Sequence, residues 1–238
     1  MRIMFLKLRI KKLWKWGAGL LLLVLLLFGS IRLFDELTRL PPEEDVRQGL
    51  IRTINAKSYR YTSEAKRIIN KEEAMISEVS GEKTLAAVHI KGSLPIINAE
   101  VEVYRFEDKM YRRDSLTKDW VVIPTASYAV TEQLVAEINP LSVFDFPEEI
   151  DVTYTGIEKV QRNACRVYEI MRRGENKYLQ LYWTDYTYKL WIDKKEGVLR
   201  KAEVRAEHRD NSQYLLQMTV MLWDFNGPIE IKPPSGQS

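Results

Sequence analysis

Cysteine and histidine are nearly missing from this 238-residue sequence, which holds one Cys and two His. The single cysteine, Cys165, excludes an intrachain disulfide. It also excludes a lipoprotein, because lipid attachment would need a cysteine directly after the N-terminal apolar run. Zinc bound by nitrogen and sulfur would need a close pair such as Cys-x-x-Cys, and the sequence has none. We therefore expect an ordinary apolar core, without a metal, to supply the stability.

The groups that hydrolases use for catalysis are missing as well. A nucleophile needs a base beside it, but His89 and His208 both fall in alternating strand patterns and are predicted to lie on polar faces. The segment 80–83, SGEK, lacks the second glycine and the spacing of a phosphate-binding loop. Cys165 lies in the strand-like ACRVYEI and is predicted to be a small buried apolar group. The sequence thus predicts no catalytic residue, no cofactor and no enzymatic activity.

No basic face is expected on the main body of the chain. The formal net charge is +3, but six of the 36 Lys and Arg precede residue 16. Residues 16–238 carry 30 basic and 33 acidic side chains, and the two signs are well mixed. Because nucleic-acid binding needs a basic face, no nucleic-acid partner is expected.

One long apolar run lies near the N-terminus. Residues 16–31, WGAGLLLLVLLLFGSI, contain no charge, and the run reaches residue 34 if Arg32 directs its charge out of the lipid. As a helix, residues 16–34 would span roughly 28 Å, close to the hydrocarbon thickness of a bilayer. Basic residues precede the run and the acidic pair 35–36 follows it, so the N-terminus is predicted to be cytoplasmic. The sequence predicts a single-pass protein of the cell membrane that contacts the bilayer through this helix.

A cleaved signal peptide is the alternative interpretation of the same run. Its basic start and apolar middle look alike, but no clean small-x-small cleavage site follows, since Phe28 stands two positions before Ser30. We therefore expect the segment to be retained. The expected organisation is a cytoplasmic tail (1–15), a transmembrane anchor (16–34), a linker (35–42) and an extracytoplasmic domain (43–238).

The domain is predicted to begin with a short helix and to continue as strands. Val46, Leu50, Ile51 and Ile54 fall at helical spacing, so residues 43–56 are predicted to form an amphipathic helix that packs against a sheet. From residue 59 onward apolar and polar residues alternate, which is typical of antiparallel strands with one buried face. The pattern predicts about ten or eleven strands and a mainly β (α+β) fold.

Turn signals separate the strands and favour hairpins in sequence order. The predicted turns are centred at residues 80–82, 107–109, 117–119, 161–163, 195–197 and 209–211.

The segment 127–146, SYAVTEQLVAEINPLSVFDF, interrupts the alternation. Its apolar residues recur at helical spacing up to Ile138, and residues 139–140, Asn-Pro, then break the pattern. For a connection between strands the segment is unusually apolar. It is predicted to cover the open side of the sheet, either as ordinary core or as a lid over a cavity.

Short motifs in the second half of the sequence resemble a known family. The segment 187–204, TYKLWIDKKEGVLRKAEV, is similar to the strand, turn and strand unit of LolA-like outer-membrane lipoprotein carriers, where an aromatic-rich strand ends in W-I-D. Residues 154–170, with a central glycine and a turn, and residues 223–234, WDFNGPIEIKPP, agree in order with that family. The resemblance extends over roughly residues 45–234. Unlike a freely shuttling carrier, this chain is predicted to keep a membrane anchor.

The resemblance implies a curved, incomplete antiparallel barrel whose helices close its mouth around a cavity for lipid or acyl chains. The predicted function is binding of a lipid or a lipidated protein in lipoprotein or lipid trafficking. A closed core filled by the same side chains is the alternative for the cavity. The candidate cavity residues are Val88, Ile90, Val101, Val103, Leu134, Ile138, Leu190, Val204, Met218 and Val220.

A second interpretation is an envelope sensor or scaffold that carries no ligand. It would bind a protein partner through the sheet edge or through the aromatic-rich segment 178–191, YLQLYWTDYTYKLW. The predicted cytoplasmic tail is too short for a folded output domain, so signalling would have to pass through another protein.

Overall fold

The structure is a computed structural model that describes residues 40–124, 141, 144, 146, 150–172 and 183–234. Those from Pro42 onward belong to one compact unit. Among the described residues no helix is long and apolar enough to cross a membrane. The predicted tail and anchor (1–34) lie outside them, as does the helical part of the segment 127–146.

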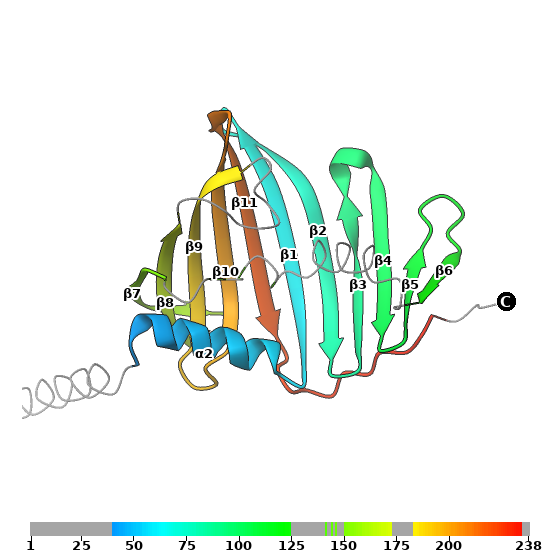
Figure 1. Cartoon of the computed structure of the whole chain (residues 1–238), viewed down its shortest axis with the longest axis horizontal. Helices are drawn as coiled ribbons and strands as arrows, with labels where there is room; N and C mark the ends of the chain where they lie inside the picture. The colour runs from blue at the N-terminus through cyan, green and yellow to red at the C-terminus, as the bar shows by residue number, and fades with distance from the viewer. Residues whose placement is uncertain are drawn as a thin grey trace, which may run out of the picture. The chain divides into compact units, whose positions relative to one another are not determined.

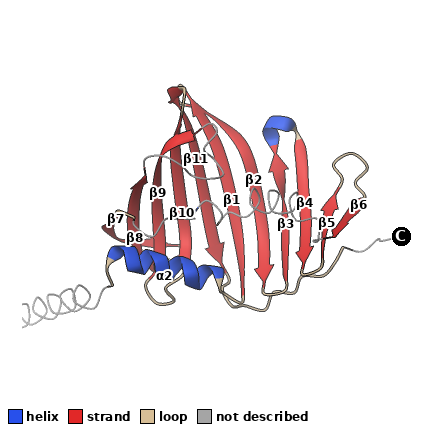
Figure 2. Cartoon of the chain, viewed as in Figure 1, coloured by secondary structure: helices blue, strands red, loops and turns tan. Residues whose placement is uncertain are grey.

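One antiparallel sheet of eleven strands forms the body of the domain (Figures 1 and 2). Its strands are β1 (Ser58–Ile69), β2 (Glu72–Thr84), β3 (Ala87–Leu94), β4 (Ala99–Phe106), β5 (Lys109–Arg113), β6 (Trp120–Pro124), β7 (Val152–Val160), β8 (Asn163–Arg172), β9 (Trp183–Asp193), β10 (Leu199–His208) and β11 (Asn211–Trp223). A helix, α2 (Pro42–Ile54), precedes them, and a 3-10 turn, η1 (Pro95–Ile97), joins β3 to β4.

The sheet consists of two runs of neighbouring hairpins that meet in the middle. The strand order is β6-β5-β4-β3-β2-β1-β11-β10-β9-β8-β7, so among the described strands the only neighbours distant in sequence are β1 and β11. They pair over ten registered positions from Arg60↔Trp223 to Ile69↔Tyr214. The predicted hairpins and the mainly β class are confirmed. The sheet is not closed, because β6 and β7 lie at its opposite edges.

Five of the six predicted turns connect strands, and the turn predicted at 80–82 is wrong. Those three residues lie inside β2, where Gly81 pairs with Tyr61 on one side and Ile90 on the other. A side chain at position 81 would collide with the ring of Tyr61. The glycine is therefore explained by a close aromatic neighbour within a strand, rather than by a turn.

Helix α2 packs on one face of the sheet, here called the inner face, as the sequence predicted. It buries Val46 and Leu50 in the same cluster as Ile192 of β9. Gly49 lets the helix approach closely, because a Cβ atom there would lie 2.7 Å from the Cδ1 atom of Ile192. At the other end of α2, the Thr53 hydroxyl donates to the Gly49 carbonyl (2.7 Å).

A buried carboxylate connects the first turn of α2 to the sheet. Asp45, which is 3% exposed, accepts two hydrogen bonds from the Arg166 guanidinium, from Nε at 2.6 Å and from Nη2 at 2.9 Å. The Tyr168 hydroxyl donates to the same carboxylate. Such bidentate, charge-assisted contacts are short and directional. They fix the start of α2 over β8, and the backbone N–H of Leu199 fixes its end by donating to the Thr53 hydroxyl (2.8 Å).

The W-I-D sequence at residues 191–193 has a separate structural role at each position. Trp191 donates from Nε1 to Glu158 (2.8 Å), and Ile192 lies against Gly49. The Asp193 carboxylate closes the β9–β10 turn by accepting from the backbone N–H groups of Lys195 and Glu196 at 2.8 and 3.0 Å. Its second oxygen accepts from Arg200 Nε at 2.9 Å. The motif therefore joins sheet, helix and turn at one point.

Replacement of Asp45 by alanine should destabilise the domain by about 3 kcal/mol, because it leaves the Arg166 guanidinium buried without its carboxylate. For a domain of this size the loss corresponds to a fall of roughly 10 °C in the melting temperature. Thermal unfolding of the full chain, followed by circular dichroism, measures it. Glu44→Ala is the matched control, since Glu44 lies in the same helical turn but, among the described residues, its carboxylate accepts a hydrogen bond only from Gln48 (2.7 Å). Equal effects of the two substitutions would contradict the assignment.

The Asp193 carboxylate should contribute stability that is lost in acid. Burial alone would raise its pKa, but the backbone N–H of Glu196 and the Arg200 guanidinium outweigh burial, so the pKa lies below its ordinary value of 3.8. A lowered folded-state pKa means that the contribution is complete above the unfolded-state pKa and disappears as the pH falls through the folded one. Urea unfolding of the wild type and Asp193→Asn should thus differ most above about pH 5 and converge below pH 3.8. A difference that is independent of pH would refute this role.

Candidate ligand-binding face

Strand register determines which side chains share the inner face. In antiparallel pairs, directly opposed residues point to the same side. Val204 opposes Met218, and Ile90 opposes Val103. Tyr61 connects the two halves, because it opposes Leu222 on β11 and Gly81 on β2.

Around β8 to β11 the inner face is a packed core. Tyr168, Leu190 and Val220 are fully buried there. Two described residues of the predicted covering segment, Phe144 and Phe146, pack on Tyr188 with ring centroids 6.1 and 5.0 Å apart. The prediction that this segment covers the sheet is confirmed for these residues and for Leu141, which belongs to the same cluster.

The eight described candidate residues all point to the inner face, but they differ in burial. Five are buried: Ile90, Val103, Leu190, Val204 and Val220. The other three, Val88, Val101 and Met218, are half-buried. Leu134 and Ile138 lie outside the described residues. The half-buried side chains are therefore the ones that a ligand can contact without displacing the core.

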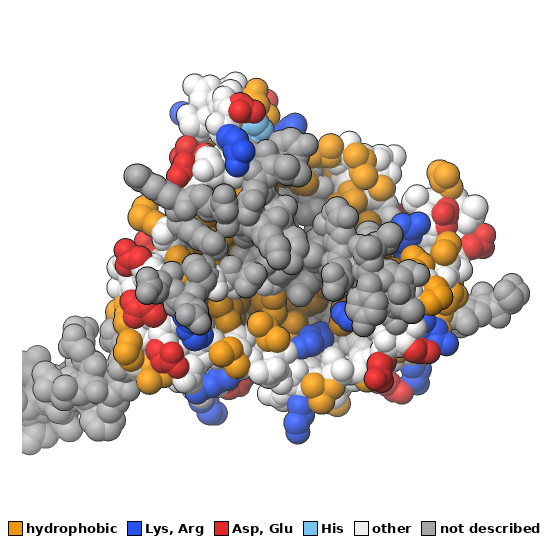
Figure 3. Space-filling view, in the orientation of Figure 1, with side chains coloured by type: hydrophobic (Ala, Val, Ile, Leu, Met, Phe, Trp, Pro, Cys, Tyr) orange, Lys and Arg blue, Asp and Glu red, His pale blue; other side chains and the backbone are white. Residues whose placement is uncertain are grey.

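Hydrophobic side chains gather on the face that carries α2, as Figure 3 shows. Two half-buried residues, Val88 on β3 and Met218 on β11, pack against the main cluster of buried residues. The apolar inner face therefore extends from β8–β11 to β3. Val79, on β2, adds to this surface and pairs with Gly92. The result is an apolar inner surface that is only partly covered by its own neighbours.

Sequence reasoning missed the tyrosines of this face. Tyr61, Tyr168, Tyr186 and Tyr188 are at most 3% exposed. Burial raises the pKa values of Tyr61, Tyr168 and Tyr186, the last to about 12, so their hydroxyls stay protonated donors. For Tyr186 and Tyr188, the alternation of apolar or aromatic residues with polar ones in the 183–190 segment, WTDYTYKL, was the sequence signal that could have indicated burial.

The aromatic-rich segment 178–191 is not a docking surface in its described part. Residues 183–191 belong to β9, which lies between β10 and β8 in the sheet. Tyr186, Tyr188 and Trp191 are buried. Interaction through this segment would require the core to open, so that part of the second interpretation is corrected.

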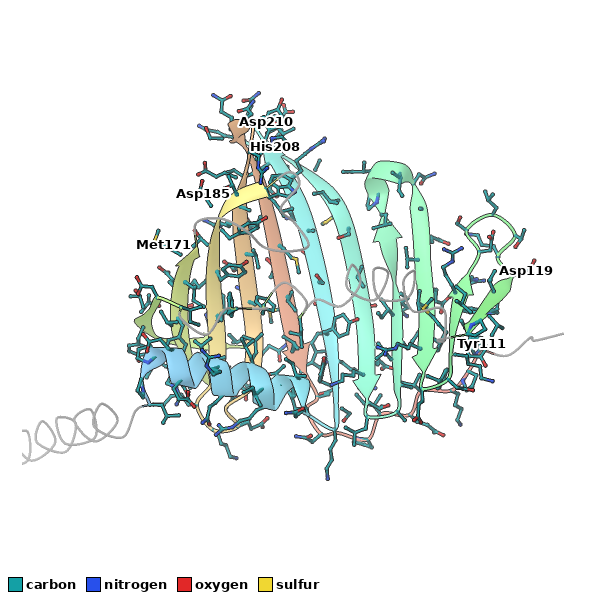
Figure 4. All side chains as sticks on the ribbon, viewed as in Figure 1. Tyr111, Asp119, Met171, Asp185, His208 and Asp210 are labelled. Carbon is teal, nitrogen blue, oxygen red and sulfur yellow. The ribbon has the colours of Figure 1, made fainter. Side chains whose placement is uncertain are left out.

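The two histidines and the cysteine, which are the side chains best suited to catalysis or metal binding, do not lie together. His89 stacks on Tyr104 on the outer face with ring centroids 4.0 Å apart, and His208 lies at the tip of the β10–β11 hairpin (Figure 4). Cys165 is fully buried, and burial raises its pKa to about 11. In the part of the chain that the structure describes, no three His, Cys, Asp or Glu side chains are placed to hold a metal.

The outer face carries a charged groove of about 440 Å³ across β1 to β5. Its walls include Glu64 and Glu78 on one side and Lys118 on the other. Lys118 pairs with Glu100 at 2.8 Å, and Arg113 with Glu102 at 3.1 Å. Arg113 and Lys118 are thus paired within the groove, whose lining holds five acidic and three basic side chains.

No family model matches the chain, and no curated protein matches it in sequence. Solved structures do match in fold. LprF from Mycobacterium bovis superposes with a TM-score of 0.54 at 12% identity, covering 82% of this chain and 97% of that one. The lipoprotein LppX of Mycobacterium tuberculosis gives 0.53 at 11% identity, with coverage of 80% and 97%.

A LolA superfamily protein, NE2245 from Nitrosomonas europaea, is also similar, with a TM-score of 0.35 and 9% identity over 81% of this chain and 96% of that one. At these identities the likeness concerns the fold alone. The chain shares its fold with LprF and LppX.

Proposed function

We propose that the domain binds a lipid, or the acyl chains of a lipidated protein, on its inner face. The observation that carries this proposal is the half-buried apolar surface formed by Val88, Val101 and Met218 beside a complete core. Covering such a surface with apolar groups lowers the free energy, because the apolar side chains are removed from water. About ten buried methylenes would supply roughly 8 kcal/mol before ordering and association costs are subtracted.

An open sheet suits such a role. Since β6 and β7 do not pair, the two edges can separate without breaking a ladder of hydrogen bonds. The fold shared with LprF and LppX is compatible with this role but does not establish it, because one fold serves many functions.

We further propose that the domain is held at the cell membrane on the extracytoplasmic side by residues 16–34. The support is the uncharged run 16–31, with six basic residues before it and an acidic pair after it. Tethering would restrict the domain to ligands close to that membrane.

A protein partner is the second candidate. The charged outer groove across β1 to β5 favours it, because a mixture of Glu and Lys side chains fits a polar protein surface better than an acyl chain. A bound protein would leave the inner face unchanged.

A charge on the inner face should impair lipid binding more than it impairs folding. Met218→Asp places a carboxylate in the half-buried surface, so the affinity for a fluorescent fatty acid should fall at least about tenfold, whereas the melting temperature should fall only a few degrees. Thr219→Asp is the matched control, because Thr219 is the next residue of β11, is equally half-buried and points to the outer face. Fluorescence titration of the full chain measures the affinity.

Two results would contradict lipid binding on this face. One is the absence of saturable probe binding by the wild type, which would favour the protein-partner candidate. The other is an equal loss of affinity in Met218→Asp and Thr219→Asp.

The mature protein should keep residues 1–34. Intact-mass measurement of protein extracted from native membranes tests this. A mature N-terminus between residues 29 and 40 would show that the apolar run is a cleaved signal, and the anchoring proposal would fail.

A further inference from the structure

From Val79 onward, the charged side chains on the inner face of β2 to β6 are all basic, whereas the outer face of the same strands carries both signs. Three charged side chains lie on the inner face there: Lys83, Arg105 and Arg112. They are the charged inner-face residues of the described strands from Val79 of β2 through β6. Register places them there, since Lys83 and Arg105 both oppose Val88, and Arg112 opposes Val103. The acidic residues of the same strands point to the outer face: Glu82, Glu100 and Glu102. One corner of the apolar face is therefore purely basic.

Lys83 is held in place by contacts that leave its charge uncompensated. Its ammonium group donates to the Ile54 carbonyl at the end of α2 and lies 5.2 Å from the centroid of the Tyr59 ring. No carboxylate of the described residues lies within ion-pair distance of it. Burial lowers its pKa, which shows that the surroundings do not replace the lost water with negative charge. An ammonium group has three donors, so it can still bind an anion.

The two arginines are exposed and form no ion pair with any described residue. Arg105 lies one strand beyond Val88, so its Cα position is about 10 Å from that of Lys83. Both side chains are long enough to converge on one group between them. A planar guanidinium fork matches the oxygens of a phosphate or a carboxylate.

A pocket of about 480 Å³ opens beside this corner. Its lining includes Lys83, Val88 and Arg105 together with the β2–β3 turn, and Glu107 is the acidic residue among the lining side chains. Beyond Val88 on the inner face, the row of apolar side chains runs through the buried Ile90 and Val103 to the half-buried Val101. The basic pocket, which could bind an anion, thus adjoins the apolar inner face.

We propose that Lys83, Arg105 and Arg112 bind the oxyanion of an amphiphile, a phosphate or a carboxylate, whose chains lie on the adjoining apolar inner face. This inference rests on the proposed lipid-binding function and specifies its ligand class as anionic. The head group occupies the pocket at the end of the sheet near the last turn of α2. The chains extend from there past Val88 toward Val101.

The test compares two ligands with the same chains, dioleoylphosphatidylglycerol and dioleoylglycerol, on the full chain by native mass spectrometry. The wild type should prefer the phospholipid. The double variant Arg105→Gln/Arg112→Gln should lose at least about tenfold in affinity for the phospholipid and change less than twofold for dioleoylglycerol. Both arginines are exposed, so this variant should fold. Lys83→Met is the second variant, with its folding checked separately because Lys83 contacts α2.

Arg205→Gln is the matched control. Arg205 is an exposed arginine on β10 that points to the outer face, next to the inward Val204. It should bind both lipids like the wild type. All variants keep the same basic N-terminal tail, so any attraction of that tail for anionic lipid cancels in the comparison.

The outcomes separate the two proposals. Equal affinity of the wild type for both lipids, or an unchanged preference in the double variant, overturns the anion site and leaves lipid binding intact. Failure of the wild type to bind either lipid overturns lipid binding and this inference with it. Inorganic phosphate is the third ligand. If the wild type binds it as tightly as the phospholipid and the double variant does not bind it, the site binds a free anion, and the proposal of an amphiphilic ligand is overturned.

Discussion

The contact between Asp45 and Arg166 determines how the rest of the domain is arranged. Helix α2 has 13 residues, a length at which an isolated helix is marginal in water, so it depends on what it packs against. The buried carboxylate ties its first turn to β8, and Thr53 ties its end to Leu199. With both ends fixed, α2 packs against β7, β9 and β10, in one half of the sheet.

This unequal cover gives the two halves of the sheet different properties. Under α2 the inner face is a core of tyrosines and aliphatic side chains with little room for a ligand. Beyond β1 the same face carries half-buried Val88 and Val101, and three basic side chains stand beside them. Under the proposed function, the core beneath α2 stabilises the domain and the half-buried surface beyond β1 binds the ligand. A change in the binding half need not weaken the half that keeps the domain folded.

Local patterns in the sequence predicted the strands, the first helix and most turns, because alternation and helical spacing are properties of short segments. Gly81 misled the prediction, since a glycine required by the Tyr61 ring resembles a glycine required by a turn. Long-range features had no local signal. Asp45 and Arg166 are 121 residues apart, and the basic corner depends on register across four strands. Alternation placed the eight described candidate residues on one face of the sheet, but their degree of burial could not be predicted, because it depends on neighbours that are distant in sequence.

The pairing of β1 with β11 has a consequence for the order of folding. The first and last strands of the domain are neighbours at the centre of the sheet, so the hairpins of β1–β6 and of β7–β10 can each form early, but they join only when β11, at the end of the chain, is present. Until then β1 and β10 each present an unpaired edge, which is a site for wrong association. Pairing over such a sequence separation is also slow. A chain that is released before β11 is complete would therefore carry two half-sheets with exposed edges.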